Sequence, residues 1–213
     1  MPLPIILTDE IKKNKIDEFS QMLNSISPAS RDFAHDHEEL FYEEGRATIW
    51  LTSSAFSKTV ALVKNCAGEV GWHGTASRIS GTTNEFLIED IMVYPQTATR
   101  STVKTDQKAY QTWLFKHDED TFKKMRMHSH SHADMDVTPS STDDNHRMDI
   151  VNMLESGDFF IFMVWNIDLK TNSMIYDMAH NKLYETDDID IKLYGEDISA
   201  CLTEAEEMVK PAK

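Results

Sequence analysis

The sequence has few of the segments and residues that mark several large protein classes. Its longest uninterrupted apolar run, Phe159 to Trp165, is far shorter than the roughly 20 residues of a membrane-spanning helix. The two cysteines, Cys66 and Cys201, are too few for a disulfide framework, which indicates a reducing compartment. Glycine and proline are also scarce, with 7 and 6 residues, so the chain does not have the composition of a disordered or low-complexity protein. We therefore expect a globular cytoplasmic protein without a membrane partner.

Basic residues are also scarce relative to acidic ones. The 21 Lys and Arg face 36 Asp and Glu, which gives a formal charge of −15. A surface that binds a nucleic-acid phosphate backbone would have to overcome the repulsion from this net negative charge. We therefore expect no nucleic-acid partner. The amino terminus also lacks a basic leader ahead of an apolar segment, so no signal peptide is predicted.

The length of 213 residues and the residue pattern predict one domain with two added segments. Near the amino terminus, apolar residues recur at helical spacing and predict one amphipathic helix; they are Ile16, Phe19, Met22, Leu23 and Ile26. We predict an N-terminal helical extension over residues 1–45, a folded domain over 46–195 and a C-terminal tail over 196–213.

Within residues 46–195, strand-like and helix-like segments are mixed, which predicts an α/β or α+β domain with a sheet flanked by helices. A helix capped by Ser53 or Ser54 ends at Gly68 and holds Cys66 in the core; a second runs from about Thr142 to Gly157. A turn at 170–172 is also predicted. The predicted strands cover 46–51, 69–74, 85–94, 125–132, 159–165 and 174–179.

Three histidines share one face of the predicted strand 125–132, because side chains alternate along a strand. They are His128, His130 and His132. Two histidines at positions i and i+2 are about 6–7 Å apart, which suits a shared Zn²⁺. Asp143 can supply a third ligand from the start of the next helix. Three protein ligands leave one tetrahedral position for water, as in catalytic zinc sites, and this arrangement favours hydrolysis.

The same residues resemble the signature of the JAMM (MPN+) metallopeptidase family: His-x-His-Pro, six residues, Ser, two residues and Asp. Counted from His130, the signature reaches His132, Ser140 and Asp143, and every spacing is met. Ala133 stands where the family has Pro. The Gly-Trp that usually precedes the histidines is missing. The residues in and around the motifs are more similar to those of bacterial and phage members than to those of eukaryotic proteasomal ones.

This resemblance implies a fold, a cofactor and roles for five residues. The fold would be a mainly antiparallel mixed sheet flanked by helices, with the cytidine-deaminase-like MPN architecture. One Zn²⁺ per chain would be held by His130, His132 and Asp143. Glu69 would act as general base and acid, and Ser140 would stabilise the oxyanion. The substrate implied is a protein with an amide or isopeptide bond, such as a ubiquitin-like modifier or its conjugate.

Several alternatives remain open at this stage. Glu85 and Glu89 are rivals of Glu69 for the base, and Ser140 is also suited to cap a helix. His128 and His73 could pack behind the ligands without binding metal. The segment 130–134 also matches the first five positions of the metallo-β-lactamase pattern His-x-His-x-Asp-His, but Met135 occupies the sixth. A non-catalytic scaffold that docks a partner is the alternative outside the hydrolases.

Overall fold

The computed structural model describes residues 45–66, 68–99, 102–195, 203 and 208. The chain divides into two compact units, Met1–Glu44 and Gly45–Lys213. The predicted helix within residues 1–44, most of the predicted tail and Cys201 lie outside the described residues. Among the residues that are described, no helix is both long enough and apolar enough to cross a membrane.

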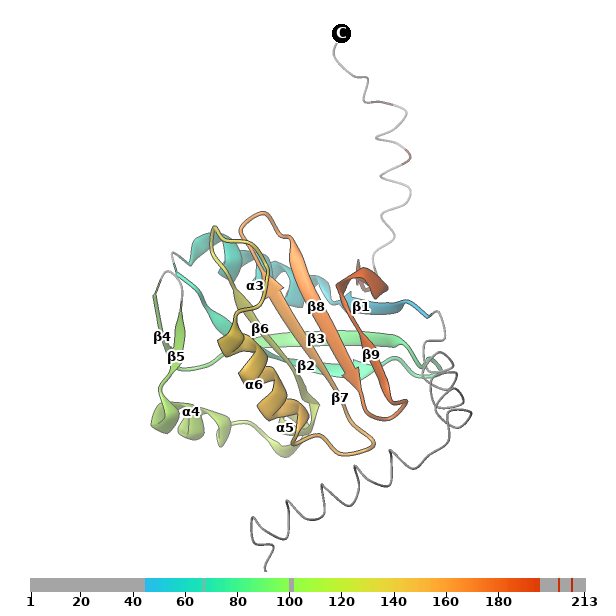
Figure 1. Ribbon diagram of the computed structural model, residues 1–213, viewed down its shortest axis with the longest axis horizontal. Helices are drawn as coiled ribbons and strands as arrows, with labels where there is room; N and C mark the ends of the chain where they lie inside the picture. Colours follow the sequence, from blue (N-terminus) through green and yellow to red (C-terminus); the bar gives the residue numbers. More distant parts are fainter. Residues whose placement is uncertain (1–44, 67, 100–101, 196–202, 204–207, 209–213) are drawn as a thin grey trace, which may run out of the picture. The chain divides into compact units, whose positions relative to one another are not determined.

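The described part of the chain forms a mixed α+β domain (Figure 1). Its strands are β1 (Ala47–Leu51), β2 (Gly71–Arg78), β3 (Glu85–Val93), β4 (Gln96–Ala98), β5 (Val103–Thr105), β6 (Met125–Ser131), β7 (Phe159–Trp165), β8 (Thr171–Asp177), β9 (Lys182–Tyr184) and β10 (Ile189–Leu193). Its helices are α3 (Ser53–Asn65), α4 (Gln107–Leu114), α5 (Glu119–Lys124), α6 (Ser141–Val151) and the 3₁₀ turn η1 (Thr186–Asp188).

Eight strands form one sheet in the order β10-β1-β3-β2-β6-β7-β8-β9, and β4 and β5 form a separate hairpin. Four of the seven pairings in the large sheet are antiparallel. The predicted mixed, mainly antiparallel sheet flanked by helices is therefore confirmed. Strand β7 is buried along its whole length, because β6 and β8 cover both its edges and helices cover its faces.

Helices α3 and α6 cover opposite faces of the sheet. Ile161 of β7 belongs to the core cluster that includes Val63 of α3. Phe162 and Val164, on the other face of β7, line a cavity beneath α6. Because side chains alternate along a strand, these two sets must face opposite ways. In Figure 1, α6 accordingly lies on the front face of the sheet, near β6 and β7.

Several predicted boundaries are wrong for local reasons. Helix α3 is capped by Thr52, whose hydroxyl accepts from the Ala55 amide. It ends before Gly68, and Cys66 is exposed at its C-terminus rather than in the core. Helix α6 ends at Val151, well before Gly157. Strand β8 starts at Thr171, so the turn lies at 166–170, where Asn166 accepts from the backbone N–H groups of residues 168 and 170.

The buried carboxylate of Asp177 provides a test of the packing. Its side chain is 0% exposed and accepts from Arg78 at 2.7 Å. Replacing Arg78 by Met would leave this charge buried, with His180 as its one remaining side-chain partner among the described residues. We expect a loss of about 3 kcal/mol in the free energy of unfolding. The control is Arg46→Met, which breaks an exposed pair with Asp190 and should cost less than about 1 kcal/mol. Urea unfolding of both variants measures the difference; equal losses would contradict the argument.

Candidate metal centre

Strand β6 brings two histidines to the end of the sheet. It pairs antiparallel with β2 on one side and parallel with β7 on the other. His130 is on the strand and His132 follows its last residue. Both are buried, and their Nε2 atoms are 3.0 Å apart. The predicted pair of convergent imidazoles is therefore present in the structure.

Asp143 reaches the same point from the first turn of α6. Its Oδ1 lies 3.3 Å from Nε2 of His130, and its Oδ2 lies 3.8 Å from Nε2 of His132. One ligand atom from each of the three residues falls within 4.8 Å of the other two. The structure thus brings the three predicted ligands together as a His-His-Asp group that could bind a metal ion.

A backbone hydrogen bond on the far side of the ring fixes the orientation of His132. Its Nδ1 lies 2.7 Å from the backbone oxygen of Asp136, and because a carbonyl oxygen can only accept, Nδ1 carries the proton. In the neutral imidazole, Nε2 then carries the lone pair and faces the other two ligands. Such a hydrogen bond is the usual way in which proteins orient a metal-binding histidine. No sequence pattern indicates this partner, because the accepting group is a backbone carbonyl in a loop.

The electrostatics prepare the group for a cation. Burial lowers the pKa of His130 to about 4, and the hydrogen bond with Asp143 raises the pKa of His132. Burial would raise the pKa of Asp143, but hydrogen bonds from His132 and from the hydroxyl and N–H groups of Ser140 hold it well below its usual value. Neutral His130 and ionised Asp143 are the states that bind metal.

Glu69 is buried beside these ligands. It directly precedes Val70 and strand β2, where the Ser131 N–H donates to the Val70 oxygen at 2.9 Å and the Val70 N–H donates to the Ser131 hydroxyl at 3.1 Å. These bonds hold the start of β2 against the end of β6. Burial raises the pKa of Glu69; the charge of His132 opposes the rise and that of Asp143 adds to it. Its raised pKa and its position beside the ligands suit Glu69 to proton exchange.

The two rival glutamates lie elsewhere. Glu85 and Glu89 are on β3, which β2 separates from β6. Glu85 accepts from the Trp50 indole at 3.0 Å, and Glu89 accepts from the Ser77 hydroxyl at 2.8 Å. The cleft of about 610 Å³ at the metal ligands is lined by Glu69 and by neither rival. Of the three candidates, the structure brings only Glu69 to the ligands.

Ser140 lies at the mouth of this cleft and caps α6. Its hydroxyl accepts from the Asp143 N–H at 3.3 Å and donates to Asp143 Oδ2 at 2.6 Å. Its own N–H donates to the same carboxylate at 2.7 Å. This reciprocal arrangement is a capping box. Asp143 therefore serves the helix terminus and the ligand group at once.

His128 and His73 lie behind the ligands in an aromatic cluster. The ring of His128 lies 6.2 Å from that of His130, and its Nε2 lies 3.3 Å from the Tyr94 hydroxyl. Nε2 of His73 lies 2.9 Å from the Tyr110 hydroxyl. Burial lowers the pKa of both histidines, to about 4 for His73. Neither belongs to the His-His-Asp group.

The loop that follows His132 differs from what a proline would allow. Ala133 has a φ of 44°, in the left-handed region, whereas proline fixes φ near −65°. The Ala133 carbonyl accepts from the Ile167 N–H at 2.9 Å, which ties this conformation to the turn after β7. The departure from the family motif at this position therefore coincides with a different backbone conformation.

A first prediction concerns metal binding. We expect the purified full chain to bind one divalent ion, and His130→Ala or Asp143→Ala to weaken binding by more than about 100-fold, beyond the effect of losing an outer partner. The matched control is His180→Ala, because His180 pairs with Asp177 and lies outside the ligand group. Metal analysis and chelator competition give the affinities. Equal binding by all four proteins would exclude this centre.

A second prediction concerns Ala133. Introducing the proline of the JAMM motif with Ala133→Pro forces an incompatible φ and should lower the free energy of unfolding by more than about 1 kcal/mol. It should also weaken metal binding, because the loop carries the Asp136 carbonyl that orients His132. Ala133→Gly tolerates the observed φ and should retain metal affinity. Thermal unfolding and metal titration test both variants; a stabilised Pro variant would contradict the observed backbone.

No protein-family profile matches the chain, and no curated protein matches it. Among solved structures, the chain is similar to the solution structure of protein DSY2949 from Desulfitobacterium hafniense. The identity is 16%, the match covers 68% of this chain and 93% of that one, and the TM-score is 0.44.

Proposed function

We propose that this protein is a zinc-dependent metallopeptidase of the JAMM type that hydrolyses amide or isopeptide bonds. The observation that carries the proposal is the convergence of His130, His132 and Asp143, with the buried Glu69 lining the same cleft. The spacing of the motif in the sequence supports the same conclusion independently. On this proposal, the mixed sheet has the cytidine-deaminase-like MPN architecture and residues 46–195 are the catalytic domain.

The donor set and its spacing support zinc as the ion. Two imidazole nitrogens and one carboxylate oxygen are ligands that Zn²⁺ accepts, at about 2.0–2.1 Å. Tetrahedral geometry at that bond length separates neighbouring ligand atoms by roughly 3.3 Å. The distances here are 3.0, 3.3 and 3.8 Å. His130, His132 and Asp143 would therefore hold the ion with little movement.

The residues around the ion would divide the chemistry between them. When bound, zinc supplies a Lewis acid that lowers the pKa of water from 15.7 toward about 7. Glu69 takes a proton from the attacking water and delivers it to the leaving amine. Ser140 donates its hydroxyl hydrogen to the oxyanion of the tetrahedral intermediate, after turning away from the Asp143 oxygen that it contacts now.

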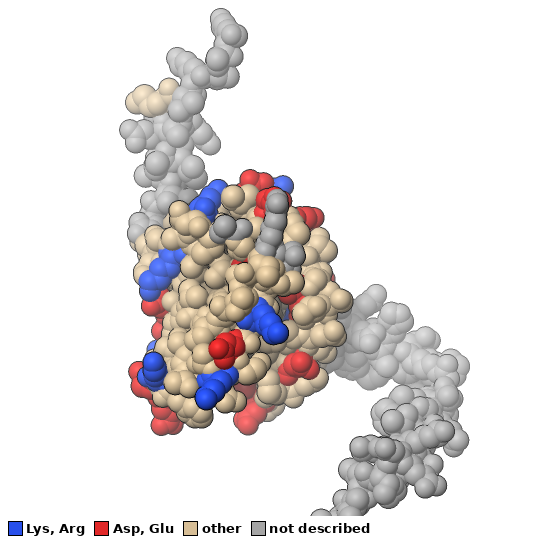
Figure 2. Space-filling view, turned by 90° about the vertical axis from the view of Figure 1, so that its left-hand side faces the viewer, with Lys and Arg blue, Asp and Glu red and all other residues tan. Residues whose placement is uncertain are grey.

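We propose a protein substrate, with a ubiquitin-like modifier or its conjugate as the class that the motif favours, and a cytoplasmic location. The excess of 36 acidic over 21 basic residues favours a partner with a basic face. In Figure 2, the basic side chains on the described part of the visible face stand among acidic and uncharged ones.

The role of Glu69 is testable without disturbing the ligands. Glu69→Gln should retain zinc and slow cleavage by about 10²–10⁴-fold, because only the proton-transfer group is lost. The control is Glu89→Gln on β3, which should cleave at the wild-type rate. The assay follows release of a fluorescent peptide whose lysine side chain is joined to the carboxyl terminus of a ubiquitin-like protein. Unchanged cleavage by Glu69→Gln would remove Glu69 from the mechanism.

The two roles of Ser140 predict different patterns. If Ser140 stabilises the oxyanion, Ser140→Ala lowers kcat by about 10²–10³-fold at unchanged zinc content. If it only caps α6, the same variant loses about 0.5–2 kcal/mol of stability, and kcat per bound zinc stays constant. Measuring kcat, zinc content and thermal stability on one preparation separates the two. We expect the first pattern, together with a small loss of stability from the cap.

A further inference from the structure

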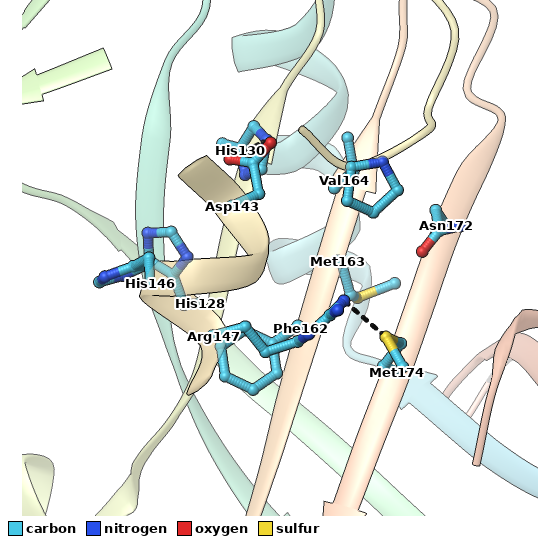
Figure 3. A pocket seen from close by; sticks show the side chains of 11 residues that line it. His128, His130, Asp143, His146, Arg147, Phe162, Met163, Val164, Asn172 and Met174 are labelled. Carbon is cyan, nitrogen blue, oxygen red and sulfur yellow. Dashed lines mark hydrogen bonds and ion pairs between the residues drawn. The ribbon is translucent and has the colours of Figure 1, made fainter. Parts of the chain in front are cut away.

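A small cavity of about 30 Å³ lies between α6 and the sheet, directly behind the metal ligands (Figure 3). His130 and Asp143 line it and also line the larger cleft, so the two spaces share a wall. Phe162, Val164 and Met174 contribute apolar surface. A space of this size holds about two water molecules.

Arg147 lines the same cavity with a guanidinium group that is poorly paired. Its Nη2 donates to Asp144 at 2.6 Å, and its Nη1 donates to the Met174 sulfur at 2.7 Å, the contact marked in Figure 3. A thioether is a weak acceptor. Its Nε is buried and has no hydrogen-bond partner among the described residues. A buried donor without a partner is costly and indicates a missing water or ligand.

The guanidinium group of Arg147 and the space favour one kind of ligand once a bound metal ion offsets the charge of Asp143. Arg147 is the only Lys or Arg among the described residues that line the cavity or the cleft. The side chain of Asn172 adds a polar group to the cavity wall. Arginine binds planar carboxylates through parallel hydrogen bonds. A carboxylate presents two oxygen acceptors, as many as the waters that the space can hold, whereas a tetrahedral phosphate presents four.

We propose that this cavity is a subsite for a carboxylate group of the substrate, bound by Arg147 with help from Asn172. The subsite rests on the function proposed above and narrows its substrate class. Because two metal ligands form its wall, the bound carboxylate lies within about one residue of the bond that is cut. The enzyme then prefers amides whose leaving amine belongs to a residue with a free carboxylate.

The binding test uses the zinc-loaded full chain, labelled with ¹⁵N, and acetate as the probe at constant ionic strength. We expect acetate to shift the side-chain Nε–H signal of Arg147 saturably, and the neutral isostere acetamide to leave it unchanged. Arg147→Gln should reduce acetate binding at least tenfold, measured by calorimetry, while Arg46→Gln leaves it unaltered. Asn172→Ala on β8, which changes no residue of α6, should weaken binding severalfold and decides the matter if Arg147→Gln folds poorly.

Three outcomes overturn the subsite. The first is no saturable effect of acetate. The second is equal binding of acetamide, which indicates an ordinary hydrated cavity. The third is acetate binding that is unchanged in folded, zinc-loaded Arg147→Gln and in Asn172→Ala, which indicates that the metal alone binds the carboxylate.

A kinetic test separates this subsite from the proposed reaction. A peptide amide with a free carboxylate on the leaving residue is compared with the same peptide in which that carboxylate is amidated. We expect wild type to favour the free acid by about tenfold or more in kcat/KM, as for a lost hydrogen bond to a charged group, and Arg147→Gln to lose the preference. Arg147-dependent acetate binding without any amide cleavage would keep the subsite and reject the peptidase. Amide cleavage without a preference for the free acid would keep the peptidase and reject the subsite.

Discussion

The antiparallel register between β2 and β6 is the constraint on which the site depends. It pairs Gly71 with His130, so the residues that precede β2 lie at the end of β6 where the ligands are. Two hydrogen bonds between Val70 and Ser131 close this end and place Glu69 beside the histidines. A slip of one residue would turn every side chain of β6 to the other face and separate the ligands from Glu69.

Asp143 connects the N-terminal cap of α6 to the histidines of the distant strand β6. As the third helical residue of α6 it completes the capping box with Ser140, and as a carboxylate it faces two imidazoles on β6. No residue of α6, all of which are described, is fully buried. The apolar contacts of this helix are therefore limited, and polar contacts at Asp143 and Arg147 contribute much of its attachment to the sheet. The helix terminus and the ligand group form one structural unit.

The sequence was sufficient to predict the elements whose signals are local. The apolar run of β7 and the alternation of β6 predict strands, and the motif spacing predicts the meeting of His130 and Asp143. Strands β9 and β10 were missed because they are short and form by pairing with distant β8 and β1. The φ of Ala133 and the poor pairing of Arg147 were also beyond prediction, because both depend on contacts with the turn after β7 and with β8.

The pairing of β1 with β10 has a consequence for folding. These are the first and last strands of the described domain, they run parallel, and the Arg46–Asp190 contact beside them joins residues 144 positions apart. Closing so long a loop is entropically expensive and slows folding. During synthesis, β1 can meet β3 early, but its outer edge has no partner until β10 has left the ribosome. Until then, the exposed edge of β1 is the place where the nascent domain can pair with a strand of another chain.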